Sequence, residues 1–185
     1  ETDQRTPLHI GIDFNVDPGC AVIAQQQTDG IHIFDEVEIY GTNTEEMVRE
    51  IQQRYPGRKY IAYPDAAGSQ RRTSAGGVTD HIILRNSGFE LKVGSVNPSV
   101  KDRIGAVNSV LKEDNIRLTI SPKCVKVIDG LRKHTYKSGS RQPDKNSGFD
   151  HFNDALGYMV NNLYAVQQTV NRPSNPVRRN TGRYI

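Results

Sequence analysis

Short apolar runs rich in β-branched residues alternate along the chain with longer segments whose apolar positions recur every three or four residues. The short runs are bounded by turn residues and predict strands; they cover 8–12, 21–25, 31–34 with its continuation 37–40, 59–63, 89–93 and 116–120. The longer segments predict helices; they cover 42–54, 78–86, 99–111, 122–131 and 150–167. Hairpin-connected strands come first and helix-connected strands follow, so we expect an α/β fold with a mixed central sheet flanked by helices.

Local signals define several element ends. The dipeptide Asp29-Gly30 is typical of a hairpin turn, and Thr42 with Glu45 forms a capping box that predicts the start of the first helix. The last helix has the clearest pattern, with apolar residues on one face at Phe152, Leu156, Met159 and Leu163. In contrast, 66–77 is glycine-rich, basic and without periodicity, which predicts a loop.

With 185 residues the chain is long enough for one domain with a sizeable core. We expect this domain at 8–170, with a linker remnant at 1–7 and a basic flexible tail at 171–185. The first residue is not Met, which suggests a piece cut from a longer protein. No apolar run suits a membrane span or a signal peptide, so no membrane partner is expected. The cysteines Cys20 and Cys124 form no CxxC pair and are expected to be buried thiols of a reduced, intracellular protein.

The formal net charge is only +3, but the basic residues are unevenly distributed. The segment 132–145 contains five lysines and arginines and a single acid, and the tail contains four arginines and no acid. Such stretches suit a polyanion, although a solvated loop and a disordered tail are alternatives. We expect double-stranded DNA to be contacted through its phosphates by Arg71, Arg72, Lys101, Arg103, Lys133, Lys137, Arg141 and Lys145.

Three distant segments each place an acid beside a predicted strand or helix. Asp13 follows the first apolar run, Asp65 follows the run at 59–63, and Asp154 lies one turn into the last helix. Charged residues are rarely buried unless paired, and carboxylates that converge from two strand ends and a helix can bind Mg²⁺ or Mn²⁺. Two such ions are a means of in-line phosphodiester cleavage, so we expect a metal-dependent DNA nuclease.

Each of these residues also has a simpler interpretation. Asp13 can face water at a strand end, Asp65 can be a turn residue, and Asp150 can cap the last helix. Asp150 shares a helical face with Asp154 and is therefore a candidate fourth metal ligand. His151 is either a ligand, a proton shuttle or a phosphate donor, or a capping or surface histidine.

Three blocks of sequence resemble the C-terminal nuclease domain of the large terminase subunit of tailed bacteriophages. They are Gly11–Pro18, Tyr63-Pro64-Asp65 and Asp150–Tyr158, and the last, of the form Asp-His-x-x-Asp-Ala-x-x-Tyr, is the most specific. Their order and spacing cover about 8–166. The resemblance implies a ribonuclease H-like fold and Mg²⁺- or Mn²⁺-dependent endonucleolytic cutting of concatemeric viral DNA during genome packaging.

The resemblance also implies roles and partners. Asp13, Asp65 and Asp154 would be the metal-binding catalytic acids, and His151 an accessory catalytic residue. A packaging ATPase domain would belong to the same full-length chain, with the portal ring and the small terminase subunit as further partners in the host cytoplasm during virus assembly. This chain has no G-x-x-x-x-G-K-[ST] phosphate loop, as expected for the nuclease part alone.

Other classes of protein are weighed against this interpretation. The segment 11–15 also resembles the first phosphate segment of actin-like ATPases and sugar kinases, but Asn15 stands where those have glycine and the chain leaves no room for their second domain. A non-catalytic DNA- or portal-binding module of the same fold is an alternative, as is a Holliday-junction resolvase or transposase-type nuclease. The tail at 171–185 is expected to be dispensable for the chemistry and either disordered or used for attachment.

Overall fold

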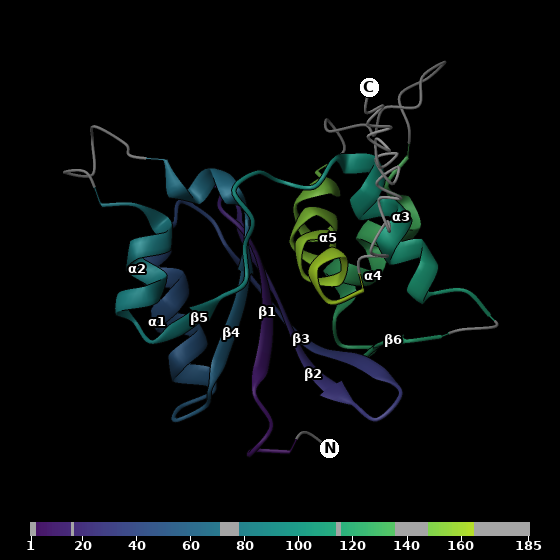
Figure 1. Cartoon of the computed structure of the whole chain (residues 1–185), viewed down its shortest axis with the longest axis horizontal. Coiled ribbons are helices and arrows are strands. Elements are labelled where there is room, and N and C mark those ends of the chain that lie inside the picture. The colour runs from purple at the N-terminus through teal and green to yellow at the C-terminus, as the bar shows by residue number, and fades with distance from the viewer. Residues whose placement is uncertain (1–2, 16, 71–77, 114–115, 136–147, 165–185) are drawn as a thin grey trace, which may run out of the picture.

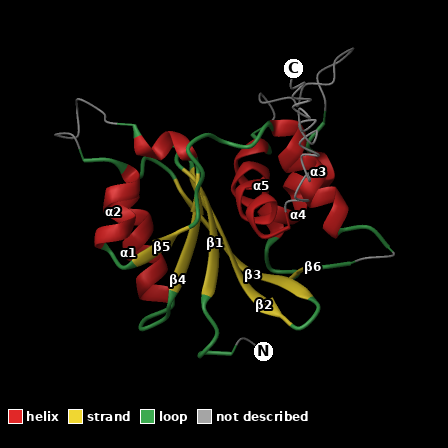
Figure 2. Ribbon diagram, viewed as in Figure 1, coloured by secondary structure: helices red, strands yellow, loops and turns green. Residues whose placement is uncertain are grey.

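The computed structural model describes residues 3–15, 17–70, 78–113, 116–135 and 148–164. At its centre lies a six-stranded sheet in the order β5-β4-β1-β2-β3-β6, shown in Figures 1 and 2. The strands are β1 Leu8–Asp13, β2 Gly19–Gln27, β3 Gly30–Ile39, β4 Tyr60–Pro64, β5 Phe89–Leu91 and β6 Leu118–Ile120. Pairing is antiparallel along β1-β2-β3 and parallel for β1-β4, β4-β5 and β3-β6. The predicted mixed sheet is confirmed.

Helices cover both faces of this sheet, as Figure 1 shows. The helices α1 (Thr44–Arg54) and α2 (Asp80–Asn86) lie on one face, and the short 3₁₀ helix η1 (Ala66–Ser69) follows β4. The other face carries α3 (Val100–Val110), α4 (Val125–Lys133) and α5 (Asp150–Tyr164). Among them α5 packs directly on β1, β2 and β4, so the last described element covers the centre of the sheet.

Side chains of β1 alternate between the two faces, and this alternation decides what α5 meets. Leu8, Ile10 and Ile12 belong to the core beneath α1 and α2, so the intervening Gly11 faces the layer of α5. A Cβ atom at Gly11 would lie 2.1 Å from the carbonyl oxygen of Ala155. The absence of a side chain at this position therefore lets the backbone of α5 rest on the strand.

The second core lies between the sheet and the layer of α3, α4 and α5. Cys20 and Cys124 are both free thiols and fully buried in it. The prediction that they act as small buried hydrophobic residues is confirmed. Burial raises the pKa of the Cys124 thiol to about 11, so this group stays protonated at neutral pH.

The first helix begins one step later than its capping box predicts. Asn43, rather than Thr42, is the N-cap, and its side chain accepts a hydrogen bond from the amide of Glu46 at 2.9 Å. The hydroxyl of Thr42 instead donates to the carboxylate of Glu46 at 3.2 Å. The prediction was wrong by one residue because two adjacent polar residues could both fill the cap.

The start of α4 also differs from the prediction, which placed it at Pro122. The helix begins at Val125, and the carboxylate of Glu36 on β3 accepts hydrogen bonds from the amides of Lys126 and Val127, each at 2.9 Å. A cap supplied by a strand 90 residues away leaves no local signal in the sequence.

Smaller differences concern element lengths. The segment 66–77 was predicted as a loop, yet its first residues form η1, capped by Asp65. The elements α2, β5 and β6 are each shorter at one end than predicted. The structure describes α5 to Tyr164, and the predicted end at 167 lies outside the described residues.

The chain before β1 contacts the domain. The side-chain amide of Gln25 donates to the carbonyls of Asp3 and Thr6 at 2.6 and 3.2 Å, and Arg58 donates to the same two carbonyls. Asp3 and Thr6, within the predicted linker remnant at 1–7, are thus bonded to Gln25 and Arg58, while the predicted tail at 171–185 lies outside the described residues. None of the helices that the structure describes has both the length and the apolar character to span a membrane.

Candidate active site

The ends of β1 and β4 lie side by side at one edge of the sheet. Ile12 stands opposite Pro64 in the parallel ladder, and the amide of Asp65 donates to the carbonyl of Ile12 at 3.2 Å. Asp13 directly follows Ile12 and Asp65 directly follows Pro64, so the register places the two acids next to each other. The predicted placement of both acids at the ends of neighbouring strands is confirmed.

Hydrogen bonds fix the carboxylate of Asp65. Its Oδ1 accepts from the amide of Ala67 at 2.7 Å, as the cap of η1, and from the side-chain amide of Asn97 at 2.5 Å. Asn97 is itself held because its Oδ1 accepts from the amide of Ala66 at 2.7 Å. The loop between β5 and α3 thereby orients the second acid of the site.

The third acid, Asp154, lies one turn inside α5 and faces a buried cation. Nη1 of Arg103, on α3, is 3.2 Å from Oδ1 of Asp154. The guanidinium carbon of Arg103 lies 4.5 Å from the ring centre of Tyr158, which is a cation–π contact. Tyr158 follows Asp154 by four residues, so both point to the same side of α5. Arg103 is only 6% exposed and Tyr158 7%.

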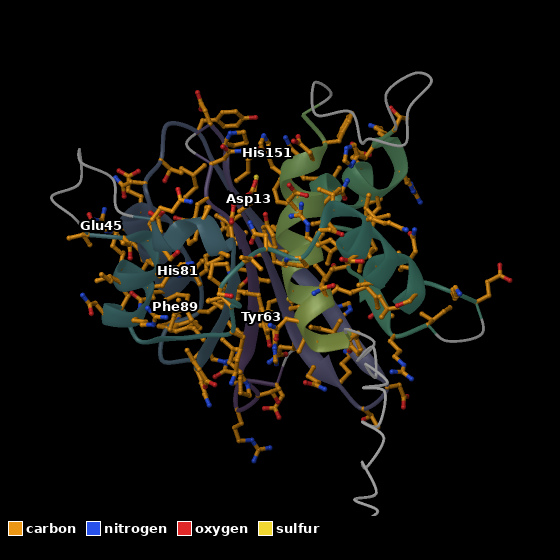
Figure 3. The ribbon with its side chains drawn as sticks, turned by 45° about the horizontal axis from the view of Figure 1, so that its top comes forward. Asp13, Glu45, Tyr63, His81, Phe89 and His151 are labelled. Atoms are coloured by element: carbon orange, nitrogen blue, oxygen red, sulfur yellow. The ribbon has the colours of Figure 1, made fainter. Side chains whose placement is uncertain are left out.

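His151 joins α5 to the end of β1. Its Nδ1 lies 3.1 Å from Oδ2 of Asp13 and 2.7 Å from the side-chain nitrogen of Asn15. Figure 3 shows Asp13 and His151 facing each other from the strand and the helix. Because Ala155, one turn after His151, rests on Gly11, the seating of the helix at the glycine sets the imidazole over Asp13.

The charges of the acids affect the pKa values of two groups of the site, Asp13 and Tyr158. Burial raises the pKa of Asp13 to about 6; repulsion from Asp154 and Asp65 adds to the rise, while His151 opposes it. The pKa of the Tyr158 phenol is raised by burial, and again Asp65, Asp154 and Asp13 all contribute to the rise, whereas Arg103 lowers it. Asp65 and Asp154 therefore both contribute to the electrostatic environment of Asp13 at the edge of the sheet.

The chemistry of this donor set fits a divalent cation. Carboxylate oxygens are the preferred protein ligands of Mg²⁺, and a cation would offset both the burial and the repulsion that raise the pKa of Asp13. Across the described residues, however, no three acidic, histidine or cysteine side chains already stand close enough to enclose one ion. The contacts of Asp154 with Arg103 and of Asp65 with Asn97 are consistent with this open arrangement.

Asp150, the candidate fourth ligand, is the first residue of α5 and only 7% exposed. Its Oδ1 has no hydrogen-bond partner and lies 3.8 Å from Nε2 of His151. It lines a cavity of about 200 Å³ between α3, α4 and α5, together with Arg103, Asn153 and Asp154. The structure thus places Asp150 beside the third acid, and its role as a ligand stays a prediction.

Asp13 also lines a second cavity, of about 310 Å³. The starts of α1 and α2 line it, with the acids Glu45 and Asp80, and its described lining includes no basic side chain. Figure 3 shows Glu45 among the side chains of this part of the molecule. Such a lining suits water or a cation better than a phosphate group.

The basic residues predicted to contact DNA divide into three groups. Lys101 and Lys133 are exposed, and Lys133 also pairs with Asp129 at 2.9 Å. Arg103 was predicted to contact phosphate, and this is wrong, because its guanidinium is buried against Asp154 and Tyr158. The others lie outside the described residues; they are Arg71, Arg72, Lys137, Arg141 and Lys145.

Three residues of the site were not singled out from the sequence. Asn15 and Asn97 are polar loop residues that contact His151 and Asp65, and nothing local to either of them indicates these distant partners. Tyr158 closes the block that begins at Asp150, so its position in that motif was a usable signal.

Comparison with known proteins supports a relationship that covers most of the chain. The family model described as the terminase RNase H-like domain matches residues 10–163. The large terminase of a thermophilic bacteriophage has a similar structure, with a TM-score of 0.65 and 14% identity. That match covers 87% of this chain but only 41% of the thermophilic phage protein, so the chain spans about two fifths of that relative.

Excised nuclease domains match over most of their own length. The nuclease domain of the P22 large terminase gives a TM-score of 0.64 at 14% identity, covering 86% of this chain and 83% of that one. The large terminase nuclease domain of bacteriophage SPP1, solved with bound Mn, gives 0.53 at 12% identity, covering 83% and 84%. At these identities the likeness shows a shared fold. No curated protein sequence is significantly similar to the chain.

Proposed function

The chain belongs to the terminase RNase H-like domain family, and from this membership and its acidic site we propose that it is a divalent-metal-dependent endonuclease acting on double-stranded DNA. The observation that carries the proposal is that Asp13 and Asp65 end neighbouring parallel strands, with Asp154 on the helix α5 that packs on both strands. Burial raises the pKa of Asp13, and repulsion from Asp154 and Asp65 adds to the rise.

Two Mg²⁺ or Mn²⁺ ions are the cofactors that we propose, held by Asp13, Asp65 and Asp154, with Asp150 as a further candidate ligand. Bound there, divalent ions would supply an activated water and stabilise the departing 3′ oxygen of the cleaved phosphodiester. Bound Mn in the SPP1 nuclease domain supports this choice of cofactor.

The protein's own groups prepare the acids for this role. His151, at 3.1 Å from Asp13, favours the ionised carboxylate that a metal needs and holds it in position. Asn97 and the amide of Ala67 orient Asp65. Asp13 is only 8% exposed, and this burial strengthens the charge interactions of its carboxylate.

DNA would be held by exposed basic side chains without reading its sequence. Of the described residues we assign Lys101 and Lys133 to phosphate contacts, since both side chains are exposed. The basic segments outside the described residues, 71–72 and 137–145, are proposed to supply the others.

In the biological setting we propose that the domain cuts concatemeric viral DNA during genome packaging, in the host cytoplasm. The thermophilic phage large terminase, of which this chain spans about two fifths, has also been solved in complex with ADP, which supports a packaging ATPase domain in the same full-length chain. The portal ring and the small terminase subunit are proposed as further partners.

The test is cleavage of a supercoiled plasmid in Mg²⁺, Mn²⁺ or EDTA. We expect nicked and linear products with either metal and none in EDTA. Asp13→Asn should abolish cleavage, while Glu113→Gln, which removes an exposed acid, should cleave as the unaltered protein does. Cleavage in EDTA, or by the Asp13→Asn protein, would contradict the proposal.

One observation favours a second candidate, a non-catalytic DNA- or portal-binding module. Asp154 already faces the buried Arg103 at 3.2 Å, and an acid neutralised by the protein itself does not require a metal. This candidate predicts DNA binding without cleavage in any metal and no change in binding for Asp13→Asn.

A further inference from the structure

The ion pair between Arg103 and Asp154 is buried but poorly aligned. Nη1 of Arg103 lies 3.2 Å from Oδ1 of Asp154, yet Nη1 and Nε of Arg103 both lack a partner with hydrogen-bond geometry. A buried ion pair recovers the cost of removing two charges from water only if its hydrogen bonds are well made. This pair is therefore held mainly by charge, and a stronger cation at Asp154 could replace it.

The neighbouring cavity offers the guanidinium another position. It measures about 200 Å³, which is room for several water molecules, and Arg103 forms part of its wall. Six buried side-chain nitrogen and oxygen atoms in the described residues have no partner, and five of them belong to residues that line this cavity.

These unpartnered atoms include acceptors suited to an arginine. Oδ1 of Asp150 and Oδ1 of Asn153 are both without a hydrogen-bond partner. The amide nitrogen of Asn153 donates to the carbonyls of Gly130 and Phe149, and this orients its Oδ1. The same nitrogen also lies 2.9 Å from Nδ1 of His134. The cavity thus holds two unsatisfied acceptors, one of them an acid, within the wall that Arg103 shares.

We propose that Arg103 is an internal counter-ion which holds Asp154 while the site is without metal and gives it up when a divalent cation binds. Its guanidinium then turns into the cavity toward Asp150 and Asn153. This inference rests on the proposed function, because it assigns Asp154 to the metal. Arg103 acts through Asp154 and is a positioning residue, and the ion pair makes metal binding weaker than the three acids alone would allow.

Calorimetric titration with Mn²⁺ tests the exchange without any cleavage assay. Arg103→Met keeps the apolar length over Tyr158 and removes the charge, so it should bind Mn²⁺ about tenfold more tightly than the unaltered protein. Arg103→Lys should stay close to the unaltered protein because it restores a cation. Lys112→Met, which removes an exposed lysine just after the same helix, is the matched control and should not change the affinity. An unchanged or weaker affinity in a folded Arg103→Met protein overturns the inference.

Substitution of Asp150 provides an independent test of the inference. Asp150→Asn removes the charged acceptor in the cavity and should weaken Mn²⁺ binding in the unaltered background but not beside Arg103→Met. If the loss is the same in both backgrounds, Asp150 acts on the metal directly and the turn of Arg103 into the cavity is wrong.

A spectroscopic readout covers the case in which Arg103→Met does not fold. The side-chain Nε–H resonance of Arg103 in the unaltered protein should shift as Mg²⁺ is added, whereas an unmoved resonance at saturating Mg²⁺ contradicts the exchange. Asp13→Asn separates this inference from the function on which it rests. If the unaltered protein binds no Mn²⁺, both fail; if Asp13→Asn abolishes binding while Arg103→Met leaves the affinity unchanged, only the role of Arg103 fails.

Discussion

Nδ1 of His151 lies 3.1 Å from Oδ2 of Asp13, although 138 residues separate the two in the chain. The same nitrogen is 2.7 Å from the side-chain amide of Asn15. If Nδ1 carries the proton, it donates to the ionised Asp13 and Asn15 must turn its oxygen to the ring. If Nδ1 accepts from Asn15, Asp13 must be protonated to share it. The protonation of Asp13 is therefore coupled to the imidazole and to the orientation of one amide.

Removing the imidazole should make metal binding more sensitive to pH. His151 lowers the pKa of Asp13, so His151→Ala should raise it further and leave less carboxylate available in acid. We expect Mn²⁺ affinity, measured by calorimetry, to fall about tenfold at pH 6 and much less at pH 8. His32→Ala, which removes a histidine bonded to Thr119 on the far side of the sheet, is the control. An equal loss at both pH values would show that His151 acts as a direct ligand.

Asp13→Asn should stabilise the metal-free protein at neutral pH. The pKa of Asp13 is raised from 3.8 to about 6, so the unfolded state loses this proton first as the pH rises. The folded state is therefore penalised progressively between about pH 4 and pH 6, by up to about 3 kcal/mol above that window. Denaturant unfolding should give Asp13→Asn a higher free energy of unfolding than the unaltered protein at pH 8, and an equal one at pH 4. A difference independent of pH would contradict this assignment.

Substitution of Asp65 should affect stability differently, because the carboxylate of Asp65 already accepts hydrogen bonds from Ala67 and Asn97. Asp65→Asn can keep the cap of η1 and should abolish cleavage with a change in unfolding free energy below about 1 kcal/mol. Asp65→Ala loses the cap and the contact with Asn97, and should cost about 1–2 kcal/mol more. Equal stabilities of the two variants, compared by denaturant unfolding, would argue against the cap.

Gly11→Ala should be strongly destabilising. Its methyl group would lie 2.1 Å from the carbonyl oxygen of Ala155, and backbone must move to make room. We expect a loss of about 3 kcal/mol or more in unfolding free energy. Gly105→Ala in α3 is the matched control, since nothing lies within 4 Å of its added carbon, and it should gain about 0.5–1 kcal/mol. A mild effect at Gly11 would mean that α5 can lift from the strand.

DNA binding should be independent of sequence and steeply dependent on salt. With roughly four to six phosphate contacts, the logarithm of the affinity should fall with the logarithm of salt concentration with a slope of about −4 to −5. Lys101→Ala should reduce that slope by about 1, and Lys133→Ala should do less because Lys133 also pairs with Asp129. Filter binding at several salt concentrations measures both, and a slope near zero would exclude phosphate contacts as the main source of affinity.

The sequence by itself determined the architecture and the positions of the acids along it. Apolar periodicity separated strands from helices, and hairpin signals implied a mixed sheet, which β1 to β6 confirm. Asp13 and Asp65 could be placed at strand ends because each directly follows an apolar run. Asp154 could be placed one turn into a helix because Phe152 and Leu156 mark its buried face. These inferences succeed because they depend on local spacing alone.

Only the tertiary structure decided which charges meet. Arg103 has the same local signature as the exposed Lys101, yet the packing of α3 on α5 buries it against Asp154. The bond from Asn97 to Asp65 likewise joins segments that no local pattern connects. Hydrophobic spacing tells which face of an element is inside, but the direction of a buried charge depends on the partner that the packed neighbour presents. That partner is set by how α5 rests on Gly11, a contact between backbones far apart in the chain.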